Sequence, residues 1–61
     1  MKEFYTVDDV QGILGIKQAK AYNIIRKLNK ELENEGYEVI KGRINKTKFE
    51  SRYMYKRNQV I

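Results

Sequence analysis

Hydrophobic side chains recur every three or four positions through the first half of the chain, which is the spacing of one buried face of an α-helix. The first such stripe begins at Val7, and Gly15 ends it after about two turns. Thr6 and Asp9 have the spacing of a capping box, with aspartate in place of glutamate, so a helix is expected to start directly after Thr6. Gly12 lies inside this helix, where it suggests that another backbone comes close.

A second, longer stripe predicts the longest helix. Its apolar positions follow helical spacing and comprise Ala21, Ile24, Ile25, Leu28 and Leu32. The helix is expected to be capped at or near Lys17, a position where serine, threonine, aspartate or asparagine is preferred. Gly36 marks its end as the left-handed residue of a Schellman cap, with Tyr37 placed to contact Leu32.

A small β-hairpin is predicted next. Residues 37–40 combine aromatic and β-branched side chains after a helix stop, as a strand does. Lys41 and Gly42 form a tight turn, and residues 43–44 begin a short returning strand. Two helices joined by a glycine turn and followed by a hairpin give the element order of a winged helix-turn-helix. With Gly15 as the turn residue, the five buried positions of that motif are Val10, Leu14, Ile16, Ala21 and Ile24.

A short third helix completes the predicted fold. Asn45 is placed to cap it, and Phe49 and Tyr53, four residues apart, anchor it. We expect Tyr37, Phe49 and Tyr53 to belong to the core, and residues 56–61 to fray because they show no period. The predicted fold class is therefore mostly α with a small β-hairpin, a single winged helix-turn-helix domain over residues 1–61.

Composition excludes several classes of function. A chain of 61 residues holds one small domain, and the absence of cysteine and histidine removes disulfides, the usual zinc ligands and the commonest general base. We therefore expect no catalytic residues, no metal, no cofactor and no small-molecule substrate. No apolar run is long enough to span a membrane, and no signal peptide is recognisable, so a soluble intracellular domain is expected.

The charged residues are segregated along the chain, whose net charge is +5. Residues 10–30 contain five lysines or arginines and no acid, whereas residues 31–40 contain four glutamates and no base. Residues 41–61 are again basic, with seven lysines or arginines against one glutamate. Basic residues clustered in this way favour a polyanion as the partner.

The long helix carries the candidate DNA contacts on the side opposite its apolar stripe. Its first outward residues are the candidates for reading base edges in the major groove: Gln18, Ala19, Tyr22, Asn23 and Arg26. The candidates for phosphate contacts are Lys17, Lys20, Lys27 and Lys30. The wing tip is short and basic, suited to a narrow minor groove, and consists of Lys41, Gly42 and Arg43.

Some of these residues have a second interpretation. The basic helix face could be a solvated amphipathic surface, although the missing acids over residues 10–30 favour polyanion contact. Tyr22 borders the apolar stripe, so packing and DNA contact are both open for it. The glutamates of residues 31–40 are expected to form a solvated helix end that repels DNA, with a partner-binding acidic patch as the alternative.

One pattern of residues extends over most of the chain. It comprises YTVDDV at residues 5–10, ILGI at 13–16 and AYNIIRKLN at 21–29, then Gly36, Tyr37, Gly42 and Phe49. Over residues 5–53 the chain thereby resembles the excisionase-type branch of the MerR-like winged helices. The resemblance implies a small DNA-binding protein of a phage or integrative mobile element, located in the bacterial cytoplasm and associated with the nucleoid. Such proteins bend or coat DNA at attachment sites so that a tyrosine recombinase excises the element, and several also repress transcription.

The predicted function is sequence-selective binding of double-stranded DNA by an excisionase, or recombination directionality factor. Its expected partners are duplex DNA, a tyrosine recombinase and neighbouring copies of itself, since a single small module covers only about 600–1,000 Å². One alternative is a small transcriptional repressor of a mobile element. Another, from a different class, is a winged helix that binds protein or RNA.

Overall fold

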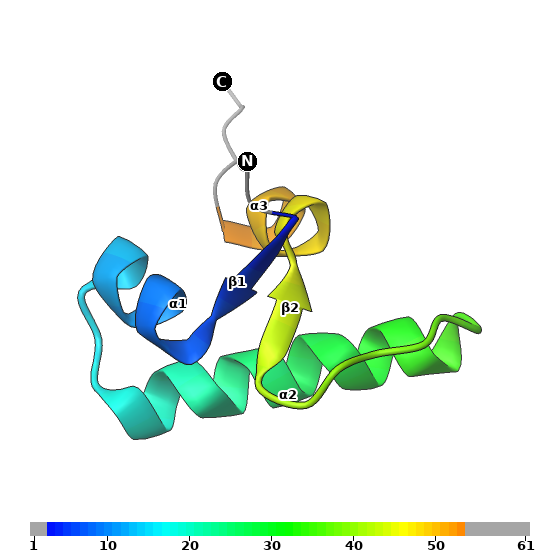
Figure 1. Ribbon diagram of the computed structural model, residues 1–61, viewed down its shortest axis with the longest axis horizontal. Helices are drawn as coiled ribbons and strands as arrows, with labels where there is room; N and C mark the ends of the chain where they lie inside the picture. The colour runs from blue at the N-terminus through cyan, green and yellow to red at the C-terminus, as the bar shows by residue number, and fades with distance from the viewer. Residues whose placement is uncertain (1–2, 54–61) are drawn as a thin grey trace.

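Three helices and two short strands make up the part of the chain that the computed structural model describes, residues 3–53 (Figure 1). Their order is β1 (Phe4–Thr6), α1 (Val7–Leu14), α2 (Gln18–Asn34), β2 (Arg43–Asn45) and α3 (Lys46–Tyr53). This confirms the mostly helical winged helix-turn-helix class predicted from the sequence. The predicted frayed tail, residues 56–61, lies outside the described residues. Within residues 3–53, no helix combines the length and the apolar character needed to cross a membrane.

Helix α1 begins and ends where its local signals place it. The Asp9 backbone N–H donates to the Thr6 hydroxyl over 3.3 Å, and the Thr6 N–H donates to the Asp9 carboxylate over 3.0 Å, so the capping box is complete. At the other end Gly15 adopts φ 65°, the left-handed conformation that glycine reaches without a steric penalty. The expectation that another backbone comes close to Gly12 is wrong. A Cβ placed there would meet nothing within 4 Å among the described residues, so no backbone of residues 3–53 approaches it closely.

Helix α2 ends in the predicted Schellman cap. The Tyr37 N–H donates to the Leu32 carbonyl over 3.0 Å, and the Gly36 N–H donates to the Glu33 carbonyl over 3.0 Å, with Gly36 at φ 96°. The expected burial of Tyr37 is wrong, because its side chain is 62% exposed. Tyr37 and Leu32 line the same open groove, so the backbone hydrogen bonds close the helix without burying this aromatic ring.

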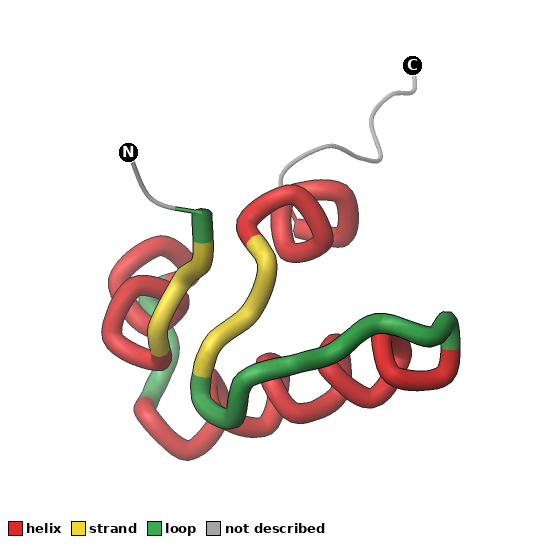
Figure 2. Tube along the Cα trace, turned by 45° about the vertical axis from the view of Figure 1, so that its right-hand side comes forward, coloured by secondary structure: helices red, strands yellow, loops and turns green. Residues whose placement is uncertain are grey.

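The strand predicted at residues 37–40 is also wrong. These residues form no strand and run back along α2, as Figure 2 shows. The antiparallel partner of β2 is β1, with Tyr5 opposite Ile44. Burial explains this choice: Ile44 is completely buried in this register, whereas Ile40 remains 52% exposed. The wing is therefore a loop leading into β2, and the two-stranded sheet joins the start of the chain to its second half.

The hydrophobic core gathers side chains from every helix and from β2. Its buried members are Val10, Ala21, Ile24, Ile25, Leu28, Ile44 and Phe49. Leu14 and Ile16 are partly buried against this cluster, so all five positions predicted for the helix-turn-helix motif pack as expected. Ala21 is fully buried, and its small side chain allows α1 and α2 to approach each other.

Phe49 holds α3 onto the core. The Tyr5 ring meets it edge-on at 5.5 Å, and the Tyr53 ring stacks on it at 5.2 Å. The Lys48 N–H donates to the Asn45 side-chain oxygen over 2.9 Å, which confirms the predicted cap of this helix. The expected core role is confirmed for Phe49, which is fully buried, whereas Tyr53 lies at the margin with 40% exposure.

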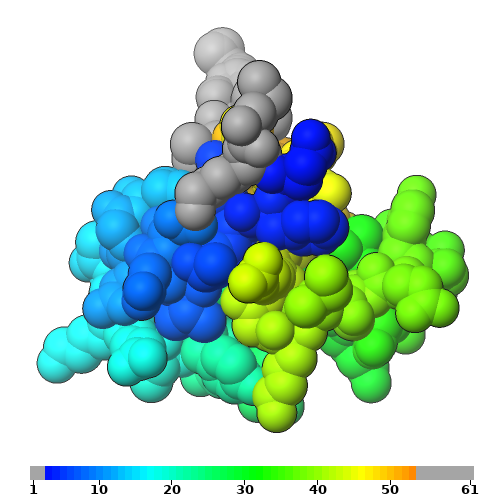
Figure 3. Space-filling model, in the orientation of Figure 1, coloured from blue at the N-terminus to red at the C-terminus, as the bar shows by residue number. Residues whose placement is uncertain are grey.

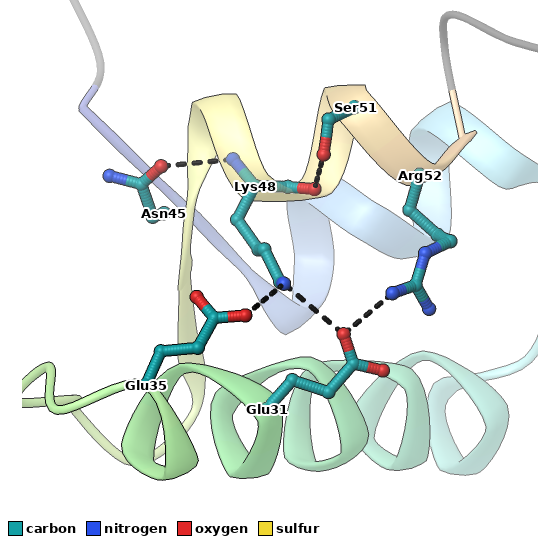
Figure 4. A network of polar contacts seen from close by, with 6 residues as sticks. All are labelled: Glu31, Glu35, Asn45, Lys48, Ser51 and Arg52. Atoms are coloured by element: carbon teal, nitrogen blue, oxygen red, sulfur yellow. Dashed lines mark hydrogen bonds and ion pairs between the residues drawn. The ribbon is translucent and has the colours of Figure 1, made fainter.

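Ion pairs join α2 to α3 (Figure 4). The Glu31 carboxylate lies 2.6 Å from the Arg52 guanidinium and 3.1 Å from the Lys48 ammonium, which is also 3.7 Å from Glu35. The prediction of a merely solvated acidic helix end is therefore wrong for Glu31 and Glu35. Two of the four glutamates face basic residues that follow them by 13 to 21 positions, which no local pattern reveals. Hydrogen bonds from Arg52, which has the larger effect, and from Lys48 hold the pKa of Glu31 below its ordinary value.

Replacing Glu31 by glutamine should lower the melting temperature at pH 7 by a few degrees at most, as is typical of exposed ion pairs. Because the pKa of Glu31 is lower in the folded chain, its stabilising effect is complete above the unfolded pKa of about 4.3 and is lost as the pH falls through the folded pKa. The difference from the parent chain should therefore shrink as the pH falls below the unfolded pKa, and it should vanish once the pH lies below the folded pKa.

The matched control is Glu33→Gln, on the same helix, since Glu33 is exposed and forms no ion pair with another described residue. Thermal melts of both variants between pH 3 and pH 7 provide the measurement. A Glu31→Gln difference that is independent of pH would contradict the role given to the ion pairs.

Candidate nucleic-acid interface

The outer face of α2 is the side opposite its buried stripe, and the structure leaves it open. Ala21, Ile25 and Leu28 are completely buried on the inner side. The candidate contact residues that are exposed are Lys17, Gln18, Ala19, Lys20, Asn23, Arg26, Lys27 and Lys30. Tyr22 is half-buried, and it is not among the side chains that pack against the core cluster. Helix α2 thus has an apolar side, which is buried in the core, and a basic side, which is exposed.

A groove of about 710 Å³ runs between this outer face and the wing segment, which we define as residues 37–42. Its walls combine helix and wing side chains: Tyr22, Asn23, Arg26, Lys27, Asn29, Lys30, Glu33, Val39, Lys41 and Gly42. In Figure 3 the yellow-green segment that links α2 to β2 projects from the surface beside the atoms of α2. The structure therefore brings most of the predicted helix contacts together with two of the three predicted wing residues.

Four of the nine candidate residues on and directly before α2 lie outside this groove. Lys17, Gln18 and Ala19 are at the first turn of α2, beyond the groove's end. Lys20 is on the other flank of the helix, in a second hollow that it shares with Asn23 and Lys27. Asn23 and Lys27 line both hollows and therefore lie between them on the outer face.

Arg43 is exposed but lies on the far side of the wing. It lines a separate groove together with residues of β1, α3 and the C-terminal end of α2. The expectation that Lys41, Gly42 and Arg43 form one tip is therefore met for the first two residues, whereas Arg43 lines a different hollow. The chain reverses between Lys41 and Arg43, because Gly42 adopts φ 79° in a turn, and Arg43 is already the first residue of β2.

The charges of this surface are unopposed within residues 3–53. Lys17, Lys20, Arg26, Lys27 and Lys30 form no ion pair with another described residue, and neither do Lys41 and Arg43. The basic residues of α3 behave differently, because Lys48 and Arg52 are paired with Glu31 and Glu35. Of the two basic zones seen in the sequence, the first remains available to a polyanion and the second is partly neutralised. Glu33 places one carboxylate at the groove, and its negative charge makes this part of the groove unfavourable for a polyanion.

One residue of the groove was not assigned a role by the sequence. Asn29 is 8% exposed and donates its side-chain amide to the carbonyls of Ile40, at 3.2 Å, and Arg43, at 2.9 Å. Its position, four residues after Ile25 at the margin of the apolar stripe, was the available signal: a polar residue there has to find hydrogen-bond partners. The partners themselves are 11 and 14 positions away and could not be identified from spacing.

The structure also confirms the cap position predicted for the start of α2. Lys17 is the N-cap residue, with extended backbone angles, and its side chain makes no capping hydrogen bond. A cation at this end opposes the helix dipole, and the missing cap leaves backbone N–H groups without a side-chain partner. The helix start thus gives up stability at a position that is exposed beside the outer face.

Comparison with known proteins points to one group. The chain is 56% identical over 54 residues to the ICEBs1 excisionase of Bacillus subtilis (strain 168), an alignment that covers 88% of this chain and 84% of that protein. No family model matches the chain. No solved structure matches it either.

Proposed function

The chain belongs to the excisionase family, and from this premise we propose that it binds duplex DNA sequence-selectively at the attachment sites of an integrative mobile element and promotes excision of the element. As an excisionase it is not an enzyme, in agreement with the expectation from the sequence. It acts by binding, and the bonds of DNA are broken and joined by the recombinase. We propose that it works on DNA of the bacterial nucleoid, within the MerR-like branch that its residues resemble.

The single observation that carries this proposal is the groove between α2 and the wing segment. A basic helix face, unopposed by ion pairs within the described residues, borders the groove on one side, and Lys41 borders it on the other. A duplex that receives α2 in its major groove presents phosphates to both flanks of the helix. The wing then meets the backbone or the adjacent minor groove.

The individual residues are assigned by their place on this surface. Gln18, Ala19, Asn23 and Arg26, with the half-buried Tyr22, are proposed to read base edges. Lys17, Lys20, Lys27 and Lys30 are proposed to contact phosphates. Lys41 and Gly42 are proposed to contact the duplex from the wing segment, and Arg43 is proposed to contact it from the other side of the wing. Glu33 marks where the duplex leaves the helix, since a carboxylate repels phosphate.

The proposed partners are the tyrosine recombinase of the element and neighbouring copies of the chain on adjacent DNA sites. A module of this size covers about 600–1,000 Å² on DNA, so several copies are needed for firm occupancy.

A reconstituted excision reaction tests this function. It contains the element's recombinase, supercoiled DNA carrying both attachment sites, and the purified chain. Addition of the chain should raise the yield of excised circle, and heat-denatured chain is the control. A chain that binds the attachment sites but leaves the yield unchanged would be assigned to the alternative of a repressor, and a chain that binds no duplex would contradict DNA binding itself.

Replacing Lys17 by serine should separate stability from binding. The new cap should raise the melting temperature by about 4–8 °C, since about 1 kcal/mol shifts a domain this small by that amount. Loss of one phosphate contact should weaken DNA binding and reduce the slope of log affinity against log salt by about one, from about −4 to −5 in the parent chain.

Lys46→Ser on α3 is the control for charge, because Lys46 belongs to a helix that the proposed DNA-binding surface does not include. Melting curves and binding isotherms at several salt concentrations measure both effects. Stabilisation of the Lys17 variant with unchanged affinity would mean that this lysine does not contact DNA, and a parent slope near zero would exclude phosphate contacts altogether.

Arg26→Ala and Asn23→Ala should weaken binding to the attachment site more than binding to a scrambled duplex, because both residues are proposed to read base edges. Each good base contact discriminates by about 1–3 kcal/mol, or roughly five- to 150-fold. Arg43→Ala should weaken binding to both duplexes by similar factors. Equal losses on the two duplexes for Arg26 and Asn23 would assign them to the phosphate backbone.

A further inference from the structure

Asn29 stands apart in the core because it is the one buried polar side chain among residues 3–53. It lies on α2, next to Leu28, at the border between the apolar stripe and the groove. A buried amide costs free energy unless it is hydrogen-bonded, and Asn29 meets this requirement through its nitrogen. The nitrogen donates to two carbonyls that belong to a different part of the chain, those of Ile40 and Arg43.

These two carbonyls are the ends of one turn, which we call the wing turn (residues 40–43). The Arg43 N–H donates to the Ile40 carbonyl over 3.1 Å and closes the turn. Gly42, at its third position, adopts φ 79°, the positive angle that a type II turn requires there. Lys41 and Gly42, between the two carbonyls, line the groove opposite the outer face of α2. Asn29 therefore fastens both ends of the segment that carries Lys41.

We propose that Asn29 is a positioning residue that sets the distance and angle of the wing turn relative to the outer face of α2, so that helix and wing contact one duplex together. This inference rests on the proposed DNA binding. Asn29 contacts no DNA itself, because it is buried beneath the groove. Its effect on affinity comes from holding Lys41 in place before binding, which removes the ordering cost that a free loop brings.

The chemistry of the side chain accounts for asparagine at this position. Its NH₂ group has two hydrogens and can serve both carbonyls at once. Aspartate of the same shape has no hydrogen to donate and would bring a negative charge against two carbonyl oxygens. Leucine has a similar size and continues the apolar stripe, so it is expected to leave the fold intact while removing both hydrogen bonds.

The experiment is a double-mutant cycle of Asn29→Leu with Lys41→Ala, measured as affinity for an attachment-site duplex. Lys41→Ala alone should weaken binding about threefold, and Asn29→Leu alone should weaken it by no more than about the same factor. In the Asn29→Leu background, Lys41→Ala should then have almost no further effect, because a wing that is not held in place has little contact to lose. Asn34→Leu, an exposed asparagine at the end of the same helix, is the matched control and should bind as the parent chain does.

Hydrogen exchange of the free protein supplies a readout that a general stabilising role would not produce. In Asn29→Leu, exchange should accelerate at the Arg43 amide, which closes the wing turn, and stay unchanged at the amides of Ile25 and Leu28 in α2. Faster exchange throughout the core would assign Asn29 to overall stability and overturn the inference.

The remaining outcomes separate this inference from the proposed function. Additive losses in the cycle, or normal binding by Asn29→Leu when Lys41→Ala weakens it, would overturn the positioning role and leave DNA binding standing. Normal binding by both single variants would show that the wing contributes nothing and would also overturn it. A parent chain that fails to bind the duplex would contradict the proposed function itself.

Discussion

Helix α2 has to supply the centre of the hydrophobic core and the binding surface at the same time. Ala21, Ile25 and Leu28 lose all contact with solvent on one side, and Asn23 and Arg26 are exposed on the other. The remaining elements follow from this constraint. Helix α1, β2 and α3 pack on the apolar side (Figures 1 and 2). The opposite side is bordered by the wing segment on one flank and by Leu14, Ile16 and Tyr53 on the other. The chain has no cysteines and cannot form disulfides, so burial of the apolar side of α2 has to supply much of the stability of so small a core.

Charge is divided along the same helix. Near its C-terminal end, Glu31 and Glu35 pair with Lys48 and Arg52 and attach α3 to α2. Towards its N-terminal end the lysines and arginine have no carboxylate opposite them among the described residues. Glu31 and Glu35 therefore serve the fold, and the cations that they neutralise do not line the groove. The field that a polyanion meets is concentrated on the outer face of α2 and the wing.

Features set by neighbouring residues were predictable, and features set by distant pairs were not. The capping box at Thr6, the turn at Gly15, the Schellman cap at Gly36 and the cap at Asn45 each depend on residues within five positions of one another, and all four form. The outer face of α2 follows from helical periodicity and is exposed as expected. In contrast, β1 and β2 pair across about forty positions, and the strand predicted at residues 37–40 does not form. The link from Asn29 to the wing turn and the separation of Arg43 from Lys41 also depend on how the loop folds back, which no local pattern encodes.

The central claim is that the outer face of α2 and the wing turn form one DNA-binding surface, with α3 excluded from it. Titration of the isotope-labelled chain with a duplex from the attachment site of its element, followed by amide chemical shifts in NMR spectra, tests this claim most directly. The account predicts that the perturbed amides belong to residues 17–30 and 40–43 and that residues 46–53 remain unaffected. Perturbations centred on α3, or on the groove lined by Phe4 and Tyr37, would contradict it.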